Sequence, residues 1–219
     1  MLPITGKFYR FIVLFFAFYF YADSGISQTG NSAWNDSLVW FGLDFSEAKL
    51  IGDFARWPAE KLRDDFLPSI NSILFYEYKK YSIRKTFFVK WVYYDILPTE
   101  HHNAEITPGH LRDCRSDYKF ENPEKQLSDV IASLRTGDAK SGIGLILIVE
   151  SFNKYLEEGS IYVTFFNIAT KKLIFSERLT GTAGGLGLPA HWARVVRHIF
   201  DLIYDHKMRE WNAMNYLNR

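Results

Sequence analysis

Glycines crowd one segment of the 219-residue chain, between positions 181 and 188. Gly185, Gly187 and Ala190 match the G-x-G-x-x-A pattern with which a helix start binds a dinucleotide pyrophosphate. That fingerprint needs the first strand of a βαβ unit, whereas the strand predicted before these glycines is the second arm of a hairpin. No lysine follows the glycines, which excludes a nucleotide-binding P-loop. We therefore expect no nucleotide cofactor, and no other cofactor is indicated.

The same loop is still a candidate site for binding an anion. A helix N-terminus presents free N–H groups and the positive end of the helix dipole, which suits an anion. The candidate anion- or partner-binding residues are Gly184, Gly185, Gly187, His191 and Arg194. The alternative is that the glycines only let the chain turn tightly against a sheet, with Trp192 filling the core beneath.

A second group of candidates lies in the polar stretch from Leu97 to Glu121, which its prolines mark as a long loop. Imidazole and carboxylate side chains are zinc ligands. The metal candidates are His101, His102, Glu105 and His110. Their spacing does not match the helical H-E-x-x-H pair, so the alternative is that these are solvated loop side chains.

Nucleophilic catalysis has no signature in the sequence. There is no G-x-S-x-G elbow, and Cys114 has no evident base partner. Paired carboxylates such as Asp64 and Asp65 are typical of a solvated surface. A site can still assemble from distant residues, so the sequence leaves an enzyme open while favouring a protein without catalytic activity.

The N-terminal segment predicts export. Lys7 and Arg10 precede an uninterrupted apolar run, Phe11–Ala22, which is typical of a secretory signal peptide. The run is short for a membrane span, which needs roughly 20 residues. No cysteine lies near the expected cleavage site, so we expect a periplasmic or secreted protein without a lipid anchor. The predicted organisation is a signal peptide at 1–22, a flexible leader at 23–36 and a single α/β domain at 37–215.

Charge and cysteine content narrow the class of protein. The net charge is +1, and removal of Lys7 and Arg10 with the signal peptide would leave about −1. A nearly neutral chain argues against binding to nucleic acid, which needs a strong basic footprint. The single cysteine allows no internal disulfide, so stability must come from a hydrophobic core.

Hydrophobic patterning predicts the elements that position these residues. Strands are expected at 38–45, 87–96, 144–150, 161–168 and 173–180. Helices are expected at 58–74, interrupted or kinked by Pro68, at 123–134, and from Pro189 to about residue 211, whose apolar stripe begins at Trp192. The predicted fold class is α/β (α+β): one mixed sheet of about five strands packed by about three helices, with a C-terminal hairpin followed by a long closing helix.

The segment from Phe165 to Ile199 resembles an uncharacterised family of exported bacterial proteins of the Bacteroidetes type. Members carry a strand of the kind "FFDI-T-kk-vLfS", then "tGkagGfGlrnyWa" and a closing helix. The matching positions are Phe165, Phe166, Ile168, Thr170, Leu173, Phe175, Ser176, Gly181, Gly184, Gly185, Gly187 and Trp192. The strand at 142–154 fits as well, whereas Pro189, Ala190 and His191 stand where the family commonly has Arg-Asn-Tyr. The fold is distantly similar to the α/β domain of the curli-secretion channel subunit.

The resemblance implies export and a fold but no activity. Together with the lack of a catalytic signature, it favours a non-enzymatic envelope domain that binds a protein or cell-surface partner, or associates with itself. The alternative is a metal-dependent hydrolase or small-ligand carrier that uses the histidine-containing stretch at 100–110.

Overall fold

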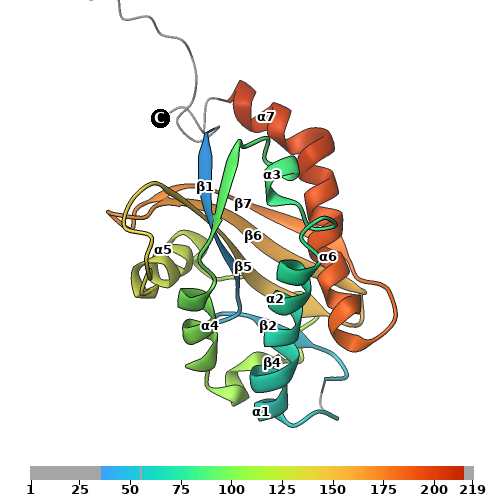
Figure 1. The fold of residues 1–219 in the computed structure, drawn as a ribbon. Helices are drawn as coiled ribbons and strands as arrows, with labels where there is room; N and C mark the ends of the chain where they lie inside the picture. Colours follow the sequence, from blue (N-terminus) through green and yellow to red (C-terminus); the bar gives the residue numbers. More distant parts are fainter. Residues whose placement is uncertain (1–35, 55, 215–219) are drawn as a thin grey trace, which may run out of the picture. The chain divides into compact units, whose positions relative to one another are not determined.

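The computed structural model describes residues 36–54 and 56–214, so the predicted signal peptide and nearly all of the leader lie outside the described residues. The fold is a mixed α/β structure, built on a seven-stranded, mostly parallel sheet (Figure 1). The strands are β1 (Ser37–Asp44), β2 (Lys49–Ile51), β3 (Trp91–Tyr94), β4 (Arg112–Asp113), β5 (Ile143–Asn153), β6 (Glu158–Asn167) and β7 (Leu173–Thr182). The α-helices are α1 (Ala59–Lys61), α2 (Leu67–Tyr76), α3 (Ile83–Thr86), α4 (Leu97–Ala104), α5 (Pro123–Ser133), α6 (Leu188–Leu202) and α7 (Met208–Ala213).

Strand β5 is the centre of the sheet. Its first half pairs in parallel with β1, and its last three residues pair in parallel with β2. On its other side it pairs antiparallel with β6, which in turn pairs with β7. Strands β3 and β4 extend the parallel part beside β1 and β2. The uninterrupted apolarity of β5 predicted a strand covered on both faces, and the structure confirms this position.

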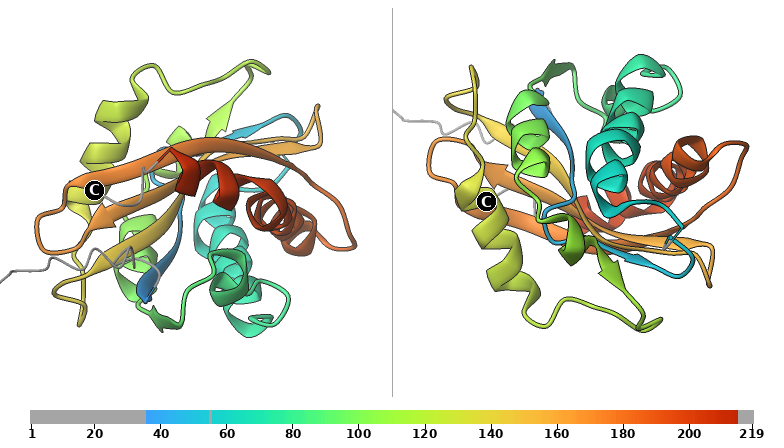
Figure 2. Two further views of the ribbon diagram at one scale, coloured as in Figure 1. Left: turned by 90° about the horizontal axis from the view of Figure 1, so that it is seen from above. Right: turned by 90° about the horizontal axis from the view of Figure 1, so that it is seen from below.

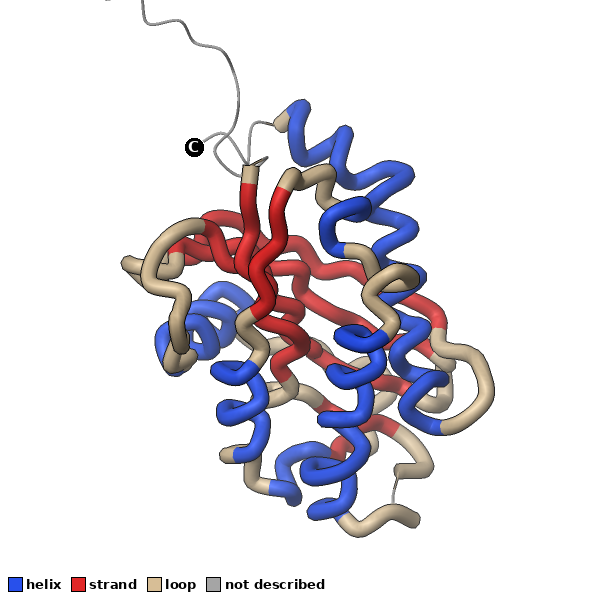
Figure 3. Tube along the Cα trace, in the orientation of Figure 1, coloured by secondary structure: helices blue, strands red, loops and turns tan. Residues whose placement is uncertain are grey.

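Each face of the sheet carries its own core. Leu145, Leu147 and Val149 point into the larger core, which includes buried side chains of α2 and α6. Ile146 and Ile148 point into a smaller core built with α5. Figures 2 and 3 show the same division, with α2 and α6 over one face of the sheet and α5 over the other.

The C-terminal unit agrees with the prediction from periodicity. The hairpin β6–β7 leads through the glycine-rich loop into α6, which continues through the π-helical turn η4 (Ile203–Lys207) into α7. Trp192 is fully buried, and its ring stacks on Phe152 with centroids 4.8 Å apart. Gly184, Gly185 and Gly187 all have positive φ, which explains why this loop needs glycine. Across the described residues, none of the helices has the length and apolarity to cross a membrane.

Strand β1 ends in a break rather than in a simple turn. Gly42 has a φ of +89°, and the pairing with β5 shifts register between Trp40 and Leu43. A Cβ on Gly42 would lie 3.0 Å from Oδ1 of Asn71, so a neighbouring side chain approaches this glycine closely. After the break the chain resumes as β2 along the same side of β5.

Two sequence predictions need correction. The stretch from Leu97 to Glu121 is not a loop, because it holds α4, the 3₁₀ turn η3 (Pro108–Leu111) and β4. Pro98 was a misleading loop signal, since it lies in the first turn of α4, where a missing N–H costs no hydrogen bond. The strand expected at 87–96 is confined to β3, because Phe87 and Val89 lead from α3 into the larger core.

The prediction that Pro68 interrupts or kinks its helix agrees in part with the structure, because a π-helical turn interrupts the α-helix just before Pro68. The helical run is continuous from α1 to α2 through the π-helical turn η2 (Leu62–Phe66). Pro68 follows that turn directly, at the second position of α2, where its lack of an N–H is tolerated.

Candidate functional site

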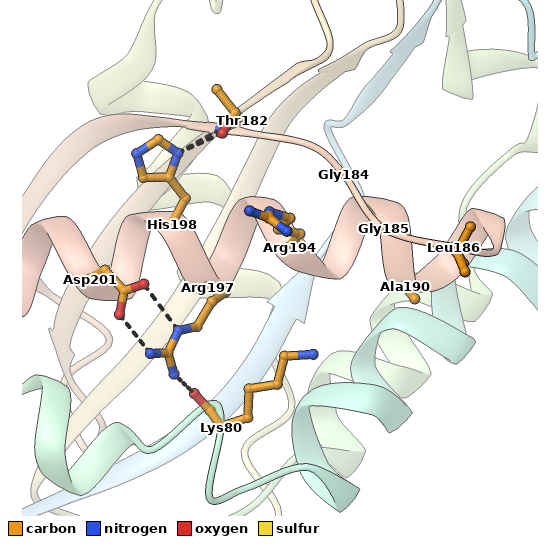
Figure 4. Close-up of a pocket in the computed structure, with 10 residues that line it drawn as sticks. All are labelled: Lys80, Thr182, Gly184, Gly185, Leu186, Ala190, Arg194, Arg197, His198 and Asp201. Atoms are coloured by element: carbon orange, nitrogen blue, oxygen red, sulfur yellow. Dashed lines mark hydrogen bonds and ion pairs between the residues drawn. The ribbon is translucent and has the colours of Figure 1, made fainter.

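A cavity of about 580 Å³ lies along the exposed side of α6. The glycine-rich loop borders it on one side, and the turn that follows α2 borders it on the other (Figure 4). It is lined by Lys80, Thr182, Gly184, Gly185, Leu186, Ala190, Arg194, Arg197, His198 and Asp201. Arg194, Arg197, His198 and Asp201 follow the helical spacing i, i+3, i+4 and i+7, so α6 presents them together.

Two arginines of this cavity differ in their bonding. Arg197 forms an ion pair with Asp201 at 3.0 Å and donates to the backbone oxygen of Lys80, which fixes its guanidinium. Arg194 is exposed and has no hydrogen bond or ion pair with any other described residue. Its stem passes close to the loop, since a Cβ on Gly184 would lie 3.1 Å from Cδ of Arg194. Arg194 is therefore the cation of this cavity that can accept an anionic group without breaking a protein contact.

The remaining polar groups of the cavity also leave it mainly positively charged. The Lys80 ammonium pairs with Glu77 at 2.9 Å at the exposed edge of the cavity. The backbone N–H of Thr182 donates to Nδ1 of His198 at 3.0 Å, so a neutral His198 carries its proton on Nε2. The cavity thus holds three permanent cations and a single carboxylate, Asp201.

The structure distributes the five predicted anion-site residues over two neighbouring hollows. Gly184, Gly185 and Arg194 line the large cavity, and Gly185 also lines the smaller one. Gly187 and His191 line a neighbouring hollow of about 250 Å³, in which Nε2 of His191 lies 2.6 Å from a carboxylate oxygen of Glu157. Arg197 and His198 also line the large cavity but were not among the predicted residues, although their helical spacing from Arg194 is a signal in the sequence. Nothing in the sequence places Lys80 beside them.

A second cavity of about 490 Å³ lies further along the same helical run. Arg84, Lys85, Phe88 and Tyr204 are among its lining residues. The rings of Phe88 and Tyr204 stack at 5.2 Å, and the Lys85 ammonium lies 4.8 Å from the centroid of the Tyr204 ring. Phe88 has a φ of +53°, a costly conformation for a bulky residue, and it holds a largely exposed ring at this position.

Both cavities belong to a surface that we call the cationic face, defined by Lys80, Arg84, Lys85, Phe88, Arg194, Arg197 and Tyr204. Residues 75–95 carry five lysines and arginines against two acidic residues, although the whole chain is nearly neutral. The same segment also carries exposed aromatic rings, of which Phe88 lies beside the cations in the second cavity. The exposed rings are Phe75, Tyr76, Tyr78, Phe88, Trp91, Tyr93 and Tyr94. Exposed apolar groups at this density mark an interaction surface.

The predicted metal candidates do not meet. His101 is exposed on α4, and His110 is exposed on η3. Glu105 faces Arg135 at 3.6 Å, whereas His102 contacts Asp44 and Ser133. Among the residues that the structure describes, no three His, Cys, Asp or Glu side chains gather in a way that could hold a metal ion.

Comparison of the chain with models of known protein families finds no match, and comparison with curated proteins finds none either. The resemblance to exported bacterial proteins therefore stays a prediction from the sequence.

Proposed function

We propose that the protein is an exported domain of the cell envelope that binds an anionic partner through the cationic face. The partner is an acidic protein segment or an anionic polymer of the cell surface. The observation that carries this proposal is the arrangement of five lysines and arginines around two neighbouring cavities, with Arg194 left without a partner among the described residues. Export enters as an expectation from the N-terminal sequence.

Charge complementarity and aromatic contacts together favour this function. A cationic surface raises the association rate of an anionic partner and suppresses cationic ones. Exposed aromatic rings supply contact area, and they lose little side-chain entropy when a partner binds. The alternative, a metal-dependent hydrolase, gains no support from the arrangement of His101, His102, Glu105 and His110.

The test measures binding of fluorescent poly-L-glutamate, an acidic polymer of defined chemistry, by fluorescence anisotropy. Replacing Lys85 and Arg194 by alanine should weaken binding about tenfold, because two rim charges at roughly 0.7 kcal/mol each contribute about 1.4 kcal/mol. The control replaces Lys119 and Lys172, two exposed lysines outside the cationic face, and should stay within about twofold of the wild type. Equal losses in both variants would mean that attraction is unspecific and would overturn the proposal.

Salt dependence gives a second criterion. The screening length falls from about 30 Å at 0.01 M to about 8 Å at 0.15 M ionic strength, so binding to the cationic face should weaken steeply over this range. Affinity that does not change with salt would contradict an electrostatic site. Sedimentation velocity of the protein alone would separate partner binding from self-association.

A further inference from the structure

Three side chains from three separate elements form a hydrogen-bonded chain outside the cationic face. Asp44 is the last residue of β1, His102 lies in α4, and Ser133 ends α5. Oδ2 of Asp44 lies 2.6 Å from Nδ1 of His102, and Nε2 of His102 lies 3.0 Å from Oγ of Ser133. This is the order of contacts in a Ser-His-Asp triad, in which an acid holds one imidazole nitrogen and the other nitrogen faces a hydroxyl.

Along this series of hydrogen bonds, the side chains become more exposed from Asp44 to Ser133. Asp44 is fully buried, and its second oxygen accepts hydrogen bonds from the backbone N–H of Ser46 at 2.9 Å and from the Ser46 hydroxyl. The Asp44 carboxylate is therefore fixed in orientation. The side chain of His102 is 17% exposed, and Ser133 is exposed. A substrate can reach the hydroxyl while the acid stays out of water.

The hydrogen-bond partners of His102 determine which of its ring nitrogens carries a proton. A carboxylate only accepts hydrogen bonds, so Nδ1 of His102 carries a proton and a neutral His102 has its lone pair on Nε2, toward Ser133. The Ser133 hydroxyl also lies 2.8 Å from the backbone oxygen of Val130, which accepts its proton while Nε2 is protonated. When His102 loses its second proton, the hydroxyl can turn its proton to Nε2. Activation of Ser133 is thus linked to the titration of His102.

We infer that Ser133 is the nucleophile of an acyl-transfer site, with His102 as general base and Asp44 as the residue that positions His102. The substrate class is a carboxylic ester. Oγ of Ser133 forms a bond to the carbonyl carbon, its proton moves to Nε2 of His102, and the ester C–O bond breaks as that proton passes to the leaving alcohol. Water then attacks the acyl group, His102 takes its proton and returns it to Oγ, and a carboxylic acid leaves. This activity is independent of partner binding by the cationic face.

Arg135 offers a cation near this nucleophile in the chain. It lies two residues beyond Ser133 and keeps only a long ion pair of 3.6 Å with Glu105. Its guanidinium is exposed, so it adds positive charge to the surface around the end of α5.

The test is covalent labelling with a fluorophosphonate probe, followed by intact mass and peptide mapping. Oγ forms a bond to phosphorus, fluoride leaves, and the hydroxyl proton moves to His102. The wild type should acquire one adduct, located on Ser133. Ser128→Ala, on the same helix, should label at the wild-type rate, and Ser133→Ala should not label. No adduct on Ser133, under conditions in which a known serine hydrolase reacts fully, would overturn the inference.

The roles of His102 and Asp44 need a readout that a purely structural contact would not change. The labelling rate should rise with pH as His102 loses its proton, and His102→Gln should reduce it by about 10²-fold or more. The hydrogen bond from Asp44 raises the pKa of His102 above its ordinary 6.5, so Asp44→Asn should move the midpoint of the pH profile downward as well as lower the rate. A rate independent of pH in the wild type would overturn the role of His102 even if the variants failed to fold.

Discussion

At the residue scale, two asparagine side chains hold the break in β1. Asn71 accepts a hydrogen bond from the backbone N–H of Leu43 at 2.8 Å and donates to its oxygen at 3.0 Å. Asn103 accepts from the backbone N–H of Phe45 at 2.7 Å and donates to the same Leu43 oxygen at 2.9 Å. All four bonds are buried, so these amides satisfy backbone groups that lack a strand partner at this point.

We expect Asn71→Ala and Asn103→Ala each to lower the free energy of unfolding by about 1–3 kcal/mol, because each leaves one buried N–H without an acceptor. The double variant should lose more than the sum of the single losses, since only then does the Leu43 oxygen lose both donors. Urea unfolding of the wild type, the two single variants and the double variant measures this double-mutant cycle. Asn212→Ala, on the exposed side of α7, serves as control. Simple additivity would mean that the Leu43 oxygen finds another donor.

The contact between His102 and Asp44 also predicts how stability depends on pH. The hydrogen bond from Asp44 is the largest of the effects that raise the pKa of His102, and burial opposes it. A raised pKa means that the folded state binds the proton more tightly than the unfolded chain, whose histidine titrates near about 6.5. The stabilisation is therefore complete below that pH and is lost as the pH rises through the pKa of the folded state.

The measurement compares wild type with His102→Gln by urea unfolding at pH values on both sides of this window. The difference in unfolding free energy should be larger at about pH 5.5 than at about pH 9, where His102 is neutral in both the folded and the unfolded state. A difference that stays constant across this range would show that the contact with Asp44 does not favour the imidazolium.

At the scale of elements, two paired glycines set the distance between α6 and the sheet. Gly159 of β6 is the register partner of Gly181 of β7. A Cβ on Gly159 would lie 2.7 Å from Cγ1 of Val195, and a Cβ on Gly181 would lie 2.4 Å from the backbone oxygen of Val195. Val195 therefore occupies space that only glycine leaves open on both strands, and this contact helps to fix the helix that carries Arg194.

Gly181→Ala should therefore cost about 1–3 kcal/mol of stability, because the added methyl group meets backbone that cannot rotate away. The same variant should weaken poly-L-glutamate binding if the helix shifts relative to the loop. Gly109→Ala is the matched control, since nothing lies within 4 Å of its Cβ position, and its effect should stay within about 0.5 kcal/mol. Thermal and urea unfolding decide the comparison, and equal effects of the two substitutions would contradict the close packing.

The elements that were predictable are the long ones with a clear period. The apolar stripe from Trp192, the hairpin β6–β7 and the apolar strand β5 carry their own signal, because each buries a regular set of side chains. Strands β2 and β4 are three and two residues long, too short for a period, and they exist only because β5 and the break in β1 position them. The polar sequence of α4 hid a helix whose buried side chains include Asn103, which bonds backbone rather than packing apolar surface.

At the scale of the whole molecule, the sites depend on residues that the chain brings together from far apart. Three of the ten residues that line the large cavity were predicted, since Gly184, Gly185 and Arg194 belong to one loop and helix. Lys80 was not, because its approach to Arg197 depends on how α2 and α6 pack on the sheet. Asp44, His102 and Ser133 share no local pattern, since 58 and 31 residues separate the successive members. A net charge near zero likewise gave no sign that cations gather on one face.

The last prediction concerns the relation between the two proposed sites. Arg194 lies on α6, over the larger core, whereas Ser133 ends α5, whose apolar side chains pack in the smaller core on the other face of the sheet (Figure 2). Two ligands influence each other only if binding of one changes the free energy of binding of the other. The sheet lies between the two sites, and its strands β5, β6 and β7 pair along most of their length. Such a packed layer resists small displacements.

Saturating poly-L-glutamate should therefore leave the labelling rate of Ser133 within about twofold, and Ser133→Ala should leave polymer binding unchanged. A tenfold change in either direction would correspond to about 1.4 kcal/mol of coupling and would require a movement that links α6 to α5.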